Sequence, residues 1–563
     1  MAGGNNIRYP SIEKPWLRYY HEDALDYSPS KENLYTHIRR GNHNHGNDIA
    51  ISFYDKNISF ADFFAEVEDA AKVLSAIGIK SGDVVSFIAV TTPEVLTAIY
   101  ALNKIGAVCN MLDPRMSDDT IHMLVEQVHS KYIILLNMFS GKISSIRGNE
   151  KITVVVIDSD SGTKDSKYVK TLSWKNLIDI YADMDEVPSF PYVENWPALI
   201  EYTGGTTGEP KGVLLSNDNI NSVSDQYSRN GIPLRRGDTW QCVAAPFIAY
   251  VMILSTHVPL SHGITVGISV YDPKLIVSDI IKNDYNHIAA NPAVWEMIIS
   301  SPDTEHKDFS RLLMPISGAD AMSIQLQKRI NQFLSERGCK NVVCNGYGMT
   351  ESGIAGCVNL SKSVSKYGSV GVPFVKTCIS AFRENTCEEL PYNTTGEICI
   401  NGPSVMIGYV NNHEATESVL KTHADGKVWL HTGDFGYIDE DGFVFIEGRI
   451  KRMLIKNNGA KVFPSIIEAV LLKNTAVYKC AVVGGPDKEN VTGQVPVAFV
   501  VLDRASLKNK NDVERELLSQ CQHDLPEYAC PEHFYFVENL PLTTIGKIDF
   551  RVLENIATQN ERG

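Results

Sequence analysis

The sequence lacks the marks of several large classes of protein. Its first residues, MAGGNNIRYPSIEKPW, do not have the basic-then-apolar order of a secretory signal. Its longest apolar run, AAPFIAYVMIL from Ala244, is shorter than the roughly 20 residues that a membrane-spanning helix requires. We therefore expect a cytoplasmic protein with no segment inserted in a membrane.

Positive charge is also in short supply. The chain has 52 Lys and Arg against 67 Asp and Glu, and its formal net charge is −15. Nucleic acids and anionic membrane surfaces both reward an excess of Lys and Arg. The composition argues against both partners, and it predicts that any bound anion is held by a local arrangement of residues.

Cysteine and histidine form no recognisable local metal motif. The eleven cysteines include no CxxC pair, and Cys339 and Cys344 have no matching second pair, so neither a zinc site nor a disulfide framework is indicated. We interpret the cysteines as buried, small apolar residues. His37, His43 and His45 fall in the Gly- and Asn-rich stretch HIRRGNHNHG, which we interpret as a solvated loop and not as a metal site.

The first few hundred residues have the pattern of an α/β protein. Residues 59–77 place apolar side chains at three-to-four spacing, with Ser59 and Asp62 as N-cap and partner, which predicts an amphipathic helix. Apolar strand-length runs at 132–136 and 152–158 alternate with helical patterns such as 93–105. This alternation predicts a parallel sheet that is covered on both faces.

At 563 residues the chain is too long for one hydrophobic core. From Gly396 onward the sequence pattern changes, and short strands separated by turns are predicted. Beyond Arg449 a second unit follows, with IKRMLIK, KCAVVGG and VPVAFVVLD as strands and with helices at PSIIEAVLLK and around 511–523. The predicted fold class is α/β. We expect a large N-terminal domain of α/β subdomains with a β-rich portion, residues 1–448, and a small α+β C-terminal domain, residues 449–563.

The stretch EYTGGTTGEPKG at 201–212 combines glycines that free the backbone, hydroxyl donors and one lysine, which together suit a phosphate. The comparison with the GxxxxGK[ST] nucleotide loop fails. Pro210 stands where the second glycine belongs, and Gly212 replaces the Ser or Thr that would hold magnesium. Taken alone, such a stretch is more often a plain turn, so its interpretation depends on the other motifs.

Four further motifs follow in order: NGYGMTES (345–352), GEICINGPSVMIGY (396–409), HTGDFGYIDEDGFVFIEGRIKRMLIK (431–456) and LPLTTIGKID (540–549). With these motifs the sequence resembles the adenylate-forming superfamily of acyl-CoA synthetases, aryl-CoA ligases, luciferases and peptide-synthetase adenylation domains. The resemblance extends from about residue 30 to 555. It implies the cofactors ATP, Mg²⁺ and coenzyme A.

The residues themselves suit a nucleotide, and the resemblance assigns them to it. Tyr347 offers an aromatic face to adenine, and Thr350 and Glu351 offer hard oxygen ligands for Mg²⁺; without the other motifs they would be a core tyrosine and a solvated glutamate. The phosphate-binding set is Thr203, Gly204, Gly205, Thr206, Thr207, Gly208 and Lys211. The adenine- and ribose-binding set is Gly318, Ala319, Asp320, Asn345, Gly346, Tyr347, Gly348, Thr350, Asp434, Ile446 and Arg449.

The resemblance also assigns residues to two successive half-reactions. Lys547 matches the adenylation lysine, which acts with Thr206 and Glu351 as the catalytic set. Lys451 matches a hinge about which the small domain swings between the steps. Lys456 and Gly459 would face the site in the thioester-forming step, although the segment carries one residue more than the usual pattern.

The acyl pocket departs from the family patterns. PFIAY at 246–250 contains neither the histidine of many acyl- and aryl-CoA ligases nor the acidic residue of amino-acid adenylation domains. Phe247, Ala249 and Tyr250 therefore favour an uncharged aliphatic or aromatic acid. Asp320 is a weaker candidate as partner for a substrate amine, since it could simply cap a turn.

These features predict an ATP-dependent acid–thiol ligase that makes acyl-CoA through an acyl-adenylate. One alternative is a stand-alone enzyme that loads an acyl or aminoacyl group onto the phosphopantetheine of a carrier protein. A second is a non-catalytic adenylate-binding module, which the presence of Lys547, Glu351 and Asp434 disfavours. A hydrolase is disfavoured because no Gly-x-Ser-x-Gly elbow is present.

Overall fold

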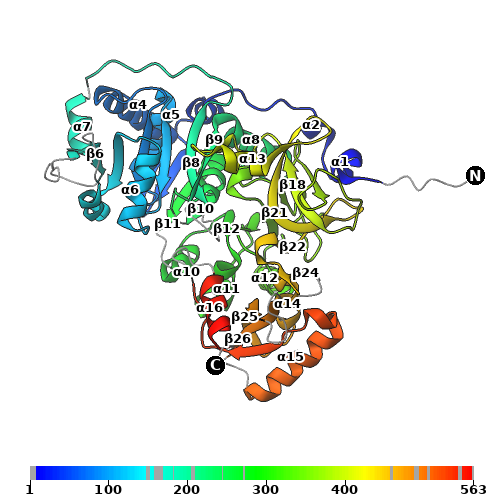
Figure 1. Cartoon of the computed structure of the whole chain (residues 1–563). Coiled ribbons are helices and arrows are strands. Elements are labelled where there is room, and N and C mark those ends of the chain that lie inside the picture. Colours follow the sequence, from blue (N-terminus) through cyan, green and yellow to red (C-terminus); the bar gives the residue numbers. More distant parts are fainter. Residues whose placement is uncertain are drawn as a thin grey trace, which may run out of the picture.

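The computed structural model has a large N-terminal body and a smaller C-terminal one, which lies below it in Figure 1. It describes residues 8–146, 152–157, 169–181, 183–203, 210–243, 245–269, 273–456, 461–486, 494–503, 508–542 and 548–560.

Two large sheets form the N-terminal body, and most of their strand pairs are parallel. The eight-stranded sheet has the order β19 (Gly408–Tyr409), β9 (Lys211–Ser216), β8 (Pro197–Thr203), β4 (Val108–Leu112), β3 (Val84–Ile88), β5 (Tyr132–Leu136), β6 (Ile152–Ile157) and β7 (Val169–Ser173). The nine-stranded sheet has the order β16 (Val372–Pro373), β15 (Cys357–Val358), β14 (Cys344–Tyr347), β13 (Met314–Ser317), β12 (His287–Ala290), β10 (Thr239–Val243), β11 (Thr265–Ser269), β1 (Ile49–Phe53) and β2 (Lys56–Ser59).

Helices pack against both sheets, as the all-apolar strands require. The helices of the N-terminal body are α1 (Pro10–Glu13), α2 (Glu22–Leu25), α3 (Leu34–Gly41), α4 (Phe60–Ala76), α5 (Pro93–Ile105), α6 (Asp118–Gln127), α7 (Trp174–Tyr181), α8 (Asn217–Arg229), α9 (Val258–Ser261), α10 (Pro273–Lys282), α11 (Pro292–Ser300), α12 (Ile324–Glu336) and α13 (His413–Val419), of which α1 and α2 pack on the β-rich sheet described next. Short 3-10 helices are η1 (Pro15–Tyr19), η2 (Asn137–Ser145), η4 (Pro302–Thr304) and η5 (Thr350–Ser352), and η3 (Tyr250–His257) is a π-helix.

The β-rich portion is a separate antiparallel sheet at the right of Figure 1. Its strands are β17 (Cys378–Phe382), β18 (Gly396–Asn401), β21 (Val428–Ile438), β20 (Leu420–Thr422) and β22 (Val444–Arg449). The expected hairpin joins β21 to β22, with Gly442 at φ +88° and its N–H donating to the Asp439 carbonyl. Trp16 of η1 packs over this turn, so the chain's first helices cover the sheet.

The C-terminal body is a small α+β unit. A three-stranded sheet of β25 (Val477–Pro486), β26 (Gln494–Leu502) and β27 (His533–Phe536) is covered by α14 (Pro464–Leu471), α15 (Lys510–Asp524) and α16 (Phe550–Asn560). Its remaining elements are η6 (Ile450–Arg452), the paired strands β23 (Leu454–Ile455) and β24 (Lys461–Val462), and η7 (Glu527–Ala529).

Two predictions of local structure are wrong, and the expectation that the cysteines are buried fails at Cys387, which is exposed in the connection between β17 and β18. IKRMLIK is not one strand, because the chain first turns through η6, where Arg452 donates to Glu468 and stacks over Phe550, and only Leu454–Ile455 is extended. His37 is not in a solvated loop. It lies on α3 with 4% of its surface exposed and packs against the ring of His257.

The helix predicted at 59–77 is confirmed as α4. The Ser59 hydroxyl accepts a hydrogen bond from the Asp62 N–H and donates to the Asp62 carboxylate, as predicted for the N-cap.

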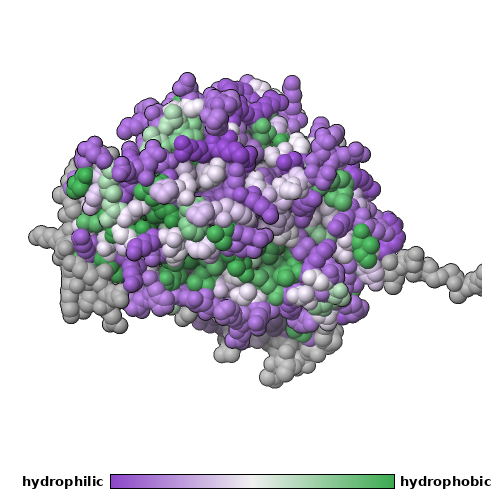
Figure 2. Space-filling model, turned by 90° about the horizontal axis from the view of Figure 1, so that it is seen from above, coloured by the Kyte–Doolittle hydropathy of each residue, from purple (hydrophilic) through white to green (hydrophobic). Residues whose placement is uncertain are grey.

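Figure 2 shows a face that is mostly hydrophilic, with a band of hydrophobic residues across its middle. Among the described residues, no helix is both long and apolar enough to cross a membrane.

Candidate active site

The Gly-rich stretch connects two neighbouring strands. Thr203 ends β8 and pairs directly with Lys211, which begins β9. The residues between them that were predicted to hold phosphate, Gly204, Gly205, Thr206, Thr207 and Gly208, lie outside the described residues. The antiparallel pairing therefore sets the two ends of the stretch side by side, so that the Lys211 ammonium lies at its base.

Tyr409 joins this hairpin to the predicted magnesium ligand. Strand β19 pairs with β9, which places the Tyr409 ring 4.9 Å below the Lys211 ammonium. The Tyr409 hydroxyl donates a 2.8 Å hydrogen bond to Oε1 of Glu351, a side chain that is largely buried. Burial and the Glu351 carboxylate both raise the pKa of Tyr409, so the phenol stays protonated and keeps donating.

Glu351 is placed by a closed turn. It lies in η5, where the Gly353 N–H donates to the Thr350 carbonyl and the Ile354 N–H donates to the Met349 carbonyl. Glu351 is a buried carboxylate that Tyr409 joins to Lys211, so it is a hard oxygen donor close to one end of the predicted phosphate-binding stretch. This donor chemistry fits Mg²⁺, which prefers carboxylate, water and phosphate oxygens.

A second cluster joins Tyr347, Asp434 and Arg449. The Tyr347 hydroxyl donates a 2.6 Å hydrogen bond to Oδ2 of Asp434, and Nε of Arg449 lies 2.9 Å from Oδ1. Asp434 and Arg449 are direct partners across β21 and β22. Burial raises the pKa of Asp434, but the Arg449 charge and the Tyr347 hydrogen bond oppose this rise and favour the carboxylate. Asp434 in turn raises the pKa of Arg449.

The residues before Tyr347 bring two strand ends together. Gly318 follows β13 and Gly346 lies in β14; a Cβ on Gly318 would come within 3.6 Å of the Gly346 carbonyl oxygen. Gly348 has no room for a side chain, since a Cβ would lie 2.0 Å from the Ile354 carbonyl oxygen. Asn345 is buried and donates to the Ser369 carbonyl.

Three other members of the predicted adenine and ribose set lie at the edges of this cluster. Ala319 adopts φ +67°, a left-handed conformation that is uncommon outside glycine. Asp320 is exposed, and its carboxylate accepts a hydrogen bond from the Ala321 N–H, which is the turn-capping alternative considered from the sequence. Ile446 is half-buried in β22 opposite Gly436.

The predicted acyl-pocket residues lie just before and at the start of the π-helix η3. Tyr250 is its first residue, and the tyrosine ring lies 3.9 Å from where a Cβ on Gly318 would be. The Tyr250 hydroxyl is buried and has no hydrogen-bond partner among the described residues, and the same holds for the Ser317 hydroxyl. Ala249 is buried, and Phe247 is half-buried beneath the Arg115 guanidinium at 5.4 Å. The pocket region therefore pairs apolar surface with unused hydroxyl groups.

The residues assigned to the second half-reaction belong to the C-terminal body. Lys451 lies in η6, directly after the strand that carries Arg449. The Lys456 ammonium forms an ion pair of 3.1 Å with Glu532. Gly459 and Lys547 lie outside the described residues.

Tyr409 is a site residue that the motifs did not reveal, although it ends the motif GEICINGPSVMIGY. A lone tyrosine after a glycine has no distinctive spacing, and only the pairing of β19 with β9 reveals its role. Thr432 was also missed, and its hydroxyl accepts a hydrogen bond from the Asp434 N–H.

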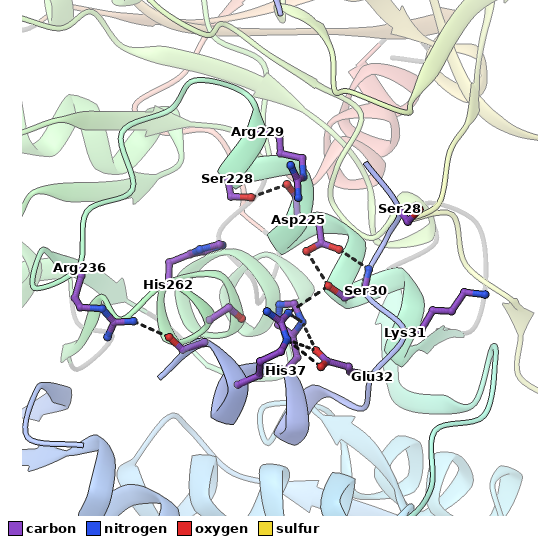
Figure 3. Close-up of a pocket in the computed structure, with 13 residues that line it drawn as sticks. Ser28, Ser30, Lys31, Glu32, His37, Asp225, Ser228, Arg229, Arg236 and His262 are labelled. Carbon is purple, nitrogen blue, oxygen red and sulfur yellow. Dashed lines mark hydrogen bonds and ion pairs between the residues drawn. The ribbon is translucent and has the colours of Figure 1, made fainter. Parts of the chain in front are cut away.

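A separate cavity of about 620 Å³ contains none of the predicted site residues. Figure 3 shows its polar walls, which come from α3, α8 and the segments beside them. Arg40 donates to Glu32 and Arg236 donates to Asn42, so much of the positive charge is used inside the walls. Burial lowers the pKa of His262 to about 4, which leaves that imidazole neutral at pH 7.

The comparison with protein families decides what these clusters belong to. The family described as "AMP-binding enzyme" matches residues 38–410, and "AMP-binding enzyme C-terminal domain" matches residues 466–547. The chain belongs to the AMP-binding enzyme family. The fold class predicted from the sequence is confirmed by solved adenylate-forming structures that align with nearly the whole chain.

Curated relatives of this AMP-binding enzyme include two kinds of CoA ligase. It is 26% identical to a long-chain-fatty-acid–CoA ligase of Bacillus subtilis, over 97% of this chain and 99% of the relative. It is 30% identical to 4-coumarate–CoA ligase 5 of Oryza sativa subsp. japonica, over 88% of each chain.

Solved structures show the same fold at lower identity. An anthranilate CoA ligase in complex with anthranoyl-AMP aligns with a TM-score of 0.81 and 21% identity, over 96% of this chain and 100% of that one. ATP-bound MatB from Rhodopseudomonas palustris aligns with a TM-score of 0.79 and 24% identity, over 93% and 99% of the two chains.

Proposed function

We propose that this AMP-binding enzyme is an AMP-forming acid–CoA ligase, in which the two clusters hold one molecule of ATP. The observation that best supports this function is the continuous path from Lys211 through Tyr409 to Glu351 at the base of the Gly-rich stretch. It offers a positive charge to phosphate and a carboxylate to its metal ion, both fixed by one aromatic ring.

The second cluster would hold the nucleoside. Asp434 already accepts hydrogen bonds from Tyr347 and Arg449, but a carboxylate has about four lone-pair positions and can accept from ribose hydroxyls as well. Arg449, whose side chain is 52% exposed, can extend toward the same sugar. We propose that the remaining residues of the predicted adenine- and ribose-binding set also contact the adenine or the ribose.

Glu351 would hold Mg²⁺, which would neutralise part of the triphosphate charge. Thr203, Lys211 and the glycines and threonines between them would bind the β- and γ-phosphates. An oxygen of the substrate carboxylate attacks the α-phosphorus, the bond from the α-phosphorus to the bridging oxygen breaks, and pyrophosphate leaves. Lys547 would place its ammonium beside the carboxylate and the α-phosphate as negative charge gathers between them.

Transfer to coenzyme A needs a second arrangement of the same chain. The thiol sulfur attacks the acyl carbon, the acyl–phosphate bond breaks, AMP leaves, and the thiol proton passes to solvent. We propose that residues 449–563 swing about Lys451 between the two steps relative to residues 1–448. Lys456 and Gly459 would then line the path of the incoming thiol, and the Lys456–Glu532 ion pair, whose two residues both belong to the small domain, would move with it.

The acyl substrate is proposed to be an uncharged aliphatic or aromatic acid. Phe247 and Ala249 supply apolar surface, and the carboxylate of Asp320, the weaker candidate partner for a substrate ammonium, accepts a hydrogen bond from the Ala321 N–H of its own turn. The unused Tyr250 hydroxyl adds one donor, which favours an acid with an oxygen acceptor along its chain or ring. Tyr250→Phe should lower kcat/KM for such acids by about tenfold while leaving purely hydrocarbon acids nearly unchanged.

The deciding experiment measures pyrophosphate exchange into ATP across a panel of carboxylic acids, followed by thioester formation with coenzyme A or with a carrier protein. We expect acid-dependent exchange and then acyl-CoA, with Mg²⁺ required. Absence of exchange with every acid would exclude the ligase, whereas exchange followed by transfer only to carrier protein would overturn coenzyme A as acceptor. Amino acids serve as the charged-substrate control in the same panel.

A further inference from the structure

A cluster of metal-binding side chains lies in the β-rich sheet, apart from the Lys211–Tyr409–Glu351 path. One ligand atom each from Cys387, His423 and His431 lies within 4.8 Å of the other two. Cys387 comes from the connection between β17 and β18, His423 directly follows β20, and His431 lies within β21. Two strand connections and one strand therefore bring one sulfur and two imidazoles to the same place.

The two imidazoles face one another through the same kind of nitrogen. Nε2 of His423 lies 2.9 Å from Nε2 of His431. Nδ1 of His431 lies 2.8 Å from Oε2 of Glu397, so the Nδ1 proton is donated to this carboxylate and the lone pair of His431 Nε2 points at His423. A carboxylate behind an imidazole is the usual support of a histidine that binds a metal ion.

His423 is held rigidly and is incompletely satisfied. Its ring stacks on Trp429 with centroids 5.5 Å apart, and the edge of Phe382 meets it at 4.6 Å. The side chain is 7% exposed, yet its Nδ1 is buried without a hydrogen-bond partner among the described residues. The hydrogen bond to His431 therefore pairs only one of the two ring nitrogens of His423.

Cys387 supplies the third ligand from the open side. It is the one exposed cysteine among the eleven, so an ion could reach its thiol directly from solvent. In a tetrahedral zinc site two imidazole nitrogens are about 3.3 Å apart, given zinc–nitrogen bonds of about 2.0–2.1 Å. The observed separation of 2.9 Å needs only a small side-chain adjustment to reach that value.

We propose that Cys387, His423 and His431 form a zinc-binding site, with Glu397 supporting His431 from behind. One thiolate and two neutral imidazoles suit Zn²⁺, and a water molecule would complete four-coordination. The Cys387 thiol releases its proton to solvent when the sulfur–zinc bond forms, the proton that His423 Nε2 donates to His431 moves to His423 Nδ1, and no oxidation is involved.

The site would brace the nucleotide-binding strand. Oε1 of Glu397 accepts a 3.1 Å hydrogen bond from the Gly433 N–H, the residue that directly precedes Asp434. Zinc bound to His431 would strengthen the hydrogen bond from His431 Nδ1 to Glu397. Glu397 would then hold Gly433 more firmly, and with it the backbone that carries Asp434.

The test loads full-length protein with zinc by equilibrium dialysis, then measures bound metal by mass spectrometry and affinity by chelator competition. We expect one zinc per chain, with Cys387→Ser and His423→Gln each weakening binding by at least about tenfold. Cys530→Ser, at a partly exposed cysteine of the C-terminal body, and His413→Gln, at an exposed histidine of α13, are the matched controls and should bind zinc as the parent does.

Cobalt substitution gives a second readout that does not depend on activity or folding yield. Bound Co²⁺ should show a thiolate-to-cobalt charge-transfer band that Cys387→Ser abolishes and Cys530→Ser retains. Added zinc should also raise the melting temperature of the parent but not of Cys387→Ser. The proposal would be overturned if the parent failed to bind zinc, or if Cys387→Ser and His423→Gln bound zinc as tightly as the parent does.

Discussion

The hydroxyl of Tyr409 donates a 2.8 Å hydrogen bond to Glu351 while the same ring lies 4.9 Å below the ammonium of Lys211. One aromatic side chain thus fixes the separation between the cation at the phosphate hairpin and the carboxylate proposed to bind Mg²⁺. The contact depends on β19, a strand of only two residues, pairing with β9.

Replacing Tyr409 by Phe keeps the ring under Lys211 but removes the hydrogen bond to Glu351. We expect kcat/KM for MgATP to fall by about tenfold, because such a hydrogen bond contributes roughly 1–1.5 kcal/mol. We also expect the variant to need a higher Mg²⁺ concentration for half-maximal activity. Pyrophosphate exchange at varied Mg²⁺ measures both. Tyr392→Phe removes a similar hydroxyl-to-Glu13 bond at the surface and should leave exchange unchanged; equal loss in both variants would contradict the role of Tyr409.

Asp434→Ala should affect recognition of the ribose more than any other part of the nucleotide. We expect the parent to prefer ATP over 2′-deoxy-ATP and the variant to lose most of that preference, with kcat/KM for ATP lowered by about 10–100-fold. Competition between the two nucleotides in the exchange assay gives the ratio. Asp185→Ala, at an exposed position, is the control; an unchanged ratio in Asp434→Ala would place the ribose elsewhere.

Lys547→Ala separates the two half-reactions. Adenylate formation should fall by at least about 100-fold, because the ammonium is proposed to meet charge that develops only during that step. Thioester formation from supplied acyl-AMP should stay within a few-fold of the parent. Lys510→Ala, at the exposed start of α15, tests for general effects on the C-terminal body. Equal loss of both half-reactions would refute the proposed alternation of domains.

Glu201 predicts a pH dependence of stability. It is 1% exposed in β8, and both carboxylate oxygens lack hydrogen-bond partners among the described residues. Burial raises the pKa of Glu201 well above that of the unfolded chain, which is about 4.3. The folded state therefore holds the proton more tightly, so stability is greatest below the unfolded pKa and falls as the pH rises through the folded pKa.

Glu201→Gln removes this titration. At pH 8 the variant should be more stable than the parent by on the order of 1–3 kcal/mol, and the difference should shrink toward pH 5. Thermal unfolding across this pH range measures the trend, with Glu186→Gln at an exposed position as control. A difference that is independent of pH would mean that the Glu201 carboxyl does not titrate in this range.

The sequence predicted regular elements best where the local signals agreed. Helix α5 spans Pro93–Ile105 as predicted, since Thr92 caps it, Pro93 begins it and Gly106 ends it with a left-handed residue. IKRMLIK failed because Arg452 is tied to Glu468 in α14, a contact that apolar content cannot reveal. The prediction for His37 failed because the His257 ring, which packs against it, comes from a distant part of the chain.

The site was less predictable than the fold for the same reason. Motifs indicated Tyr347, Glu351 and Asp434, each of which the structure brings to one of the two clusters. Tyr409 and the Cys387–His423–His431 group depend on strand pairing between distant segments, and ligand spacings of 36 and 8 residues fit no short motif. Lys547 and Gly459 remain predictions from the sequence.

The turn that follows Tyr347 has a consequence for insertions and deletions. Gly348 lies against the Ile354 carbonyl, and hydrogen bonds close the chain from Met349 to Ile354, so this segment has no slack. Together with the hydrogen bonds from Tyr347 to Asp434 and from Tyr409 to Glu351, its length sets the distance between the ring of Tyr347 and the carboxylate of Glu351. The backbone of this segment thus fixes the spacing of the two side chains. Adding or removing one residue should therefore change which nucleotide fits, even if every side chain that contacts the nucleotide is kept.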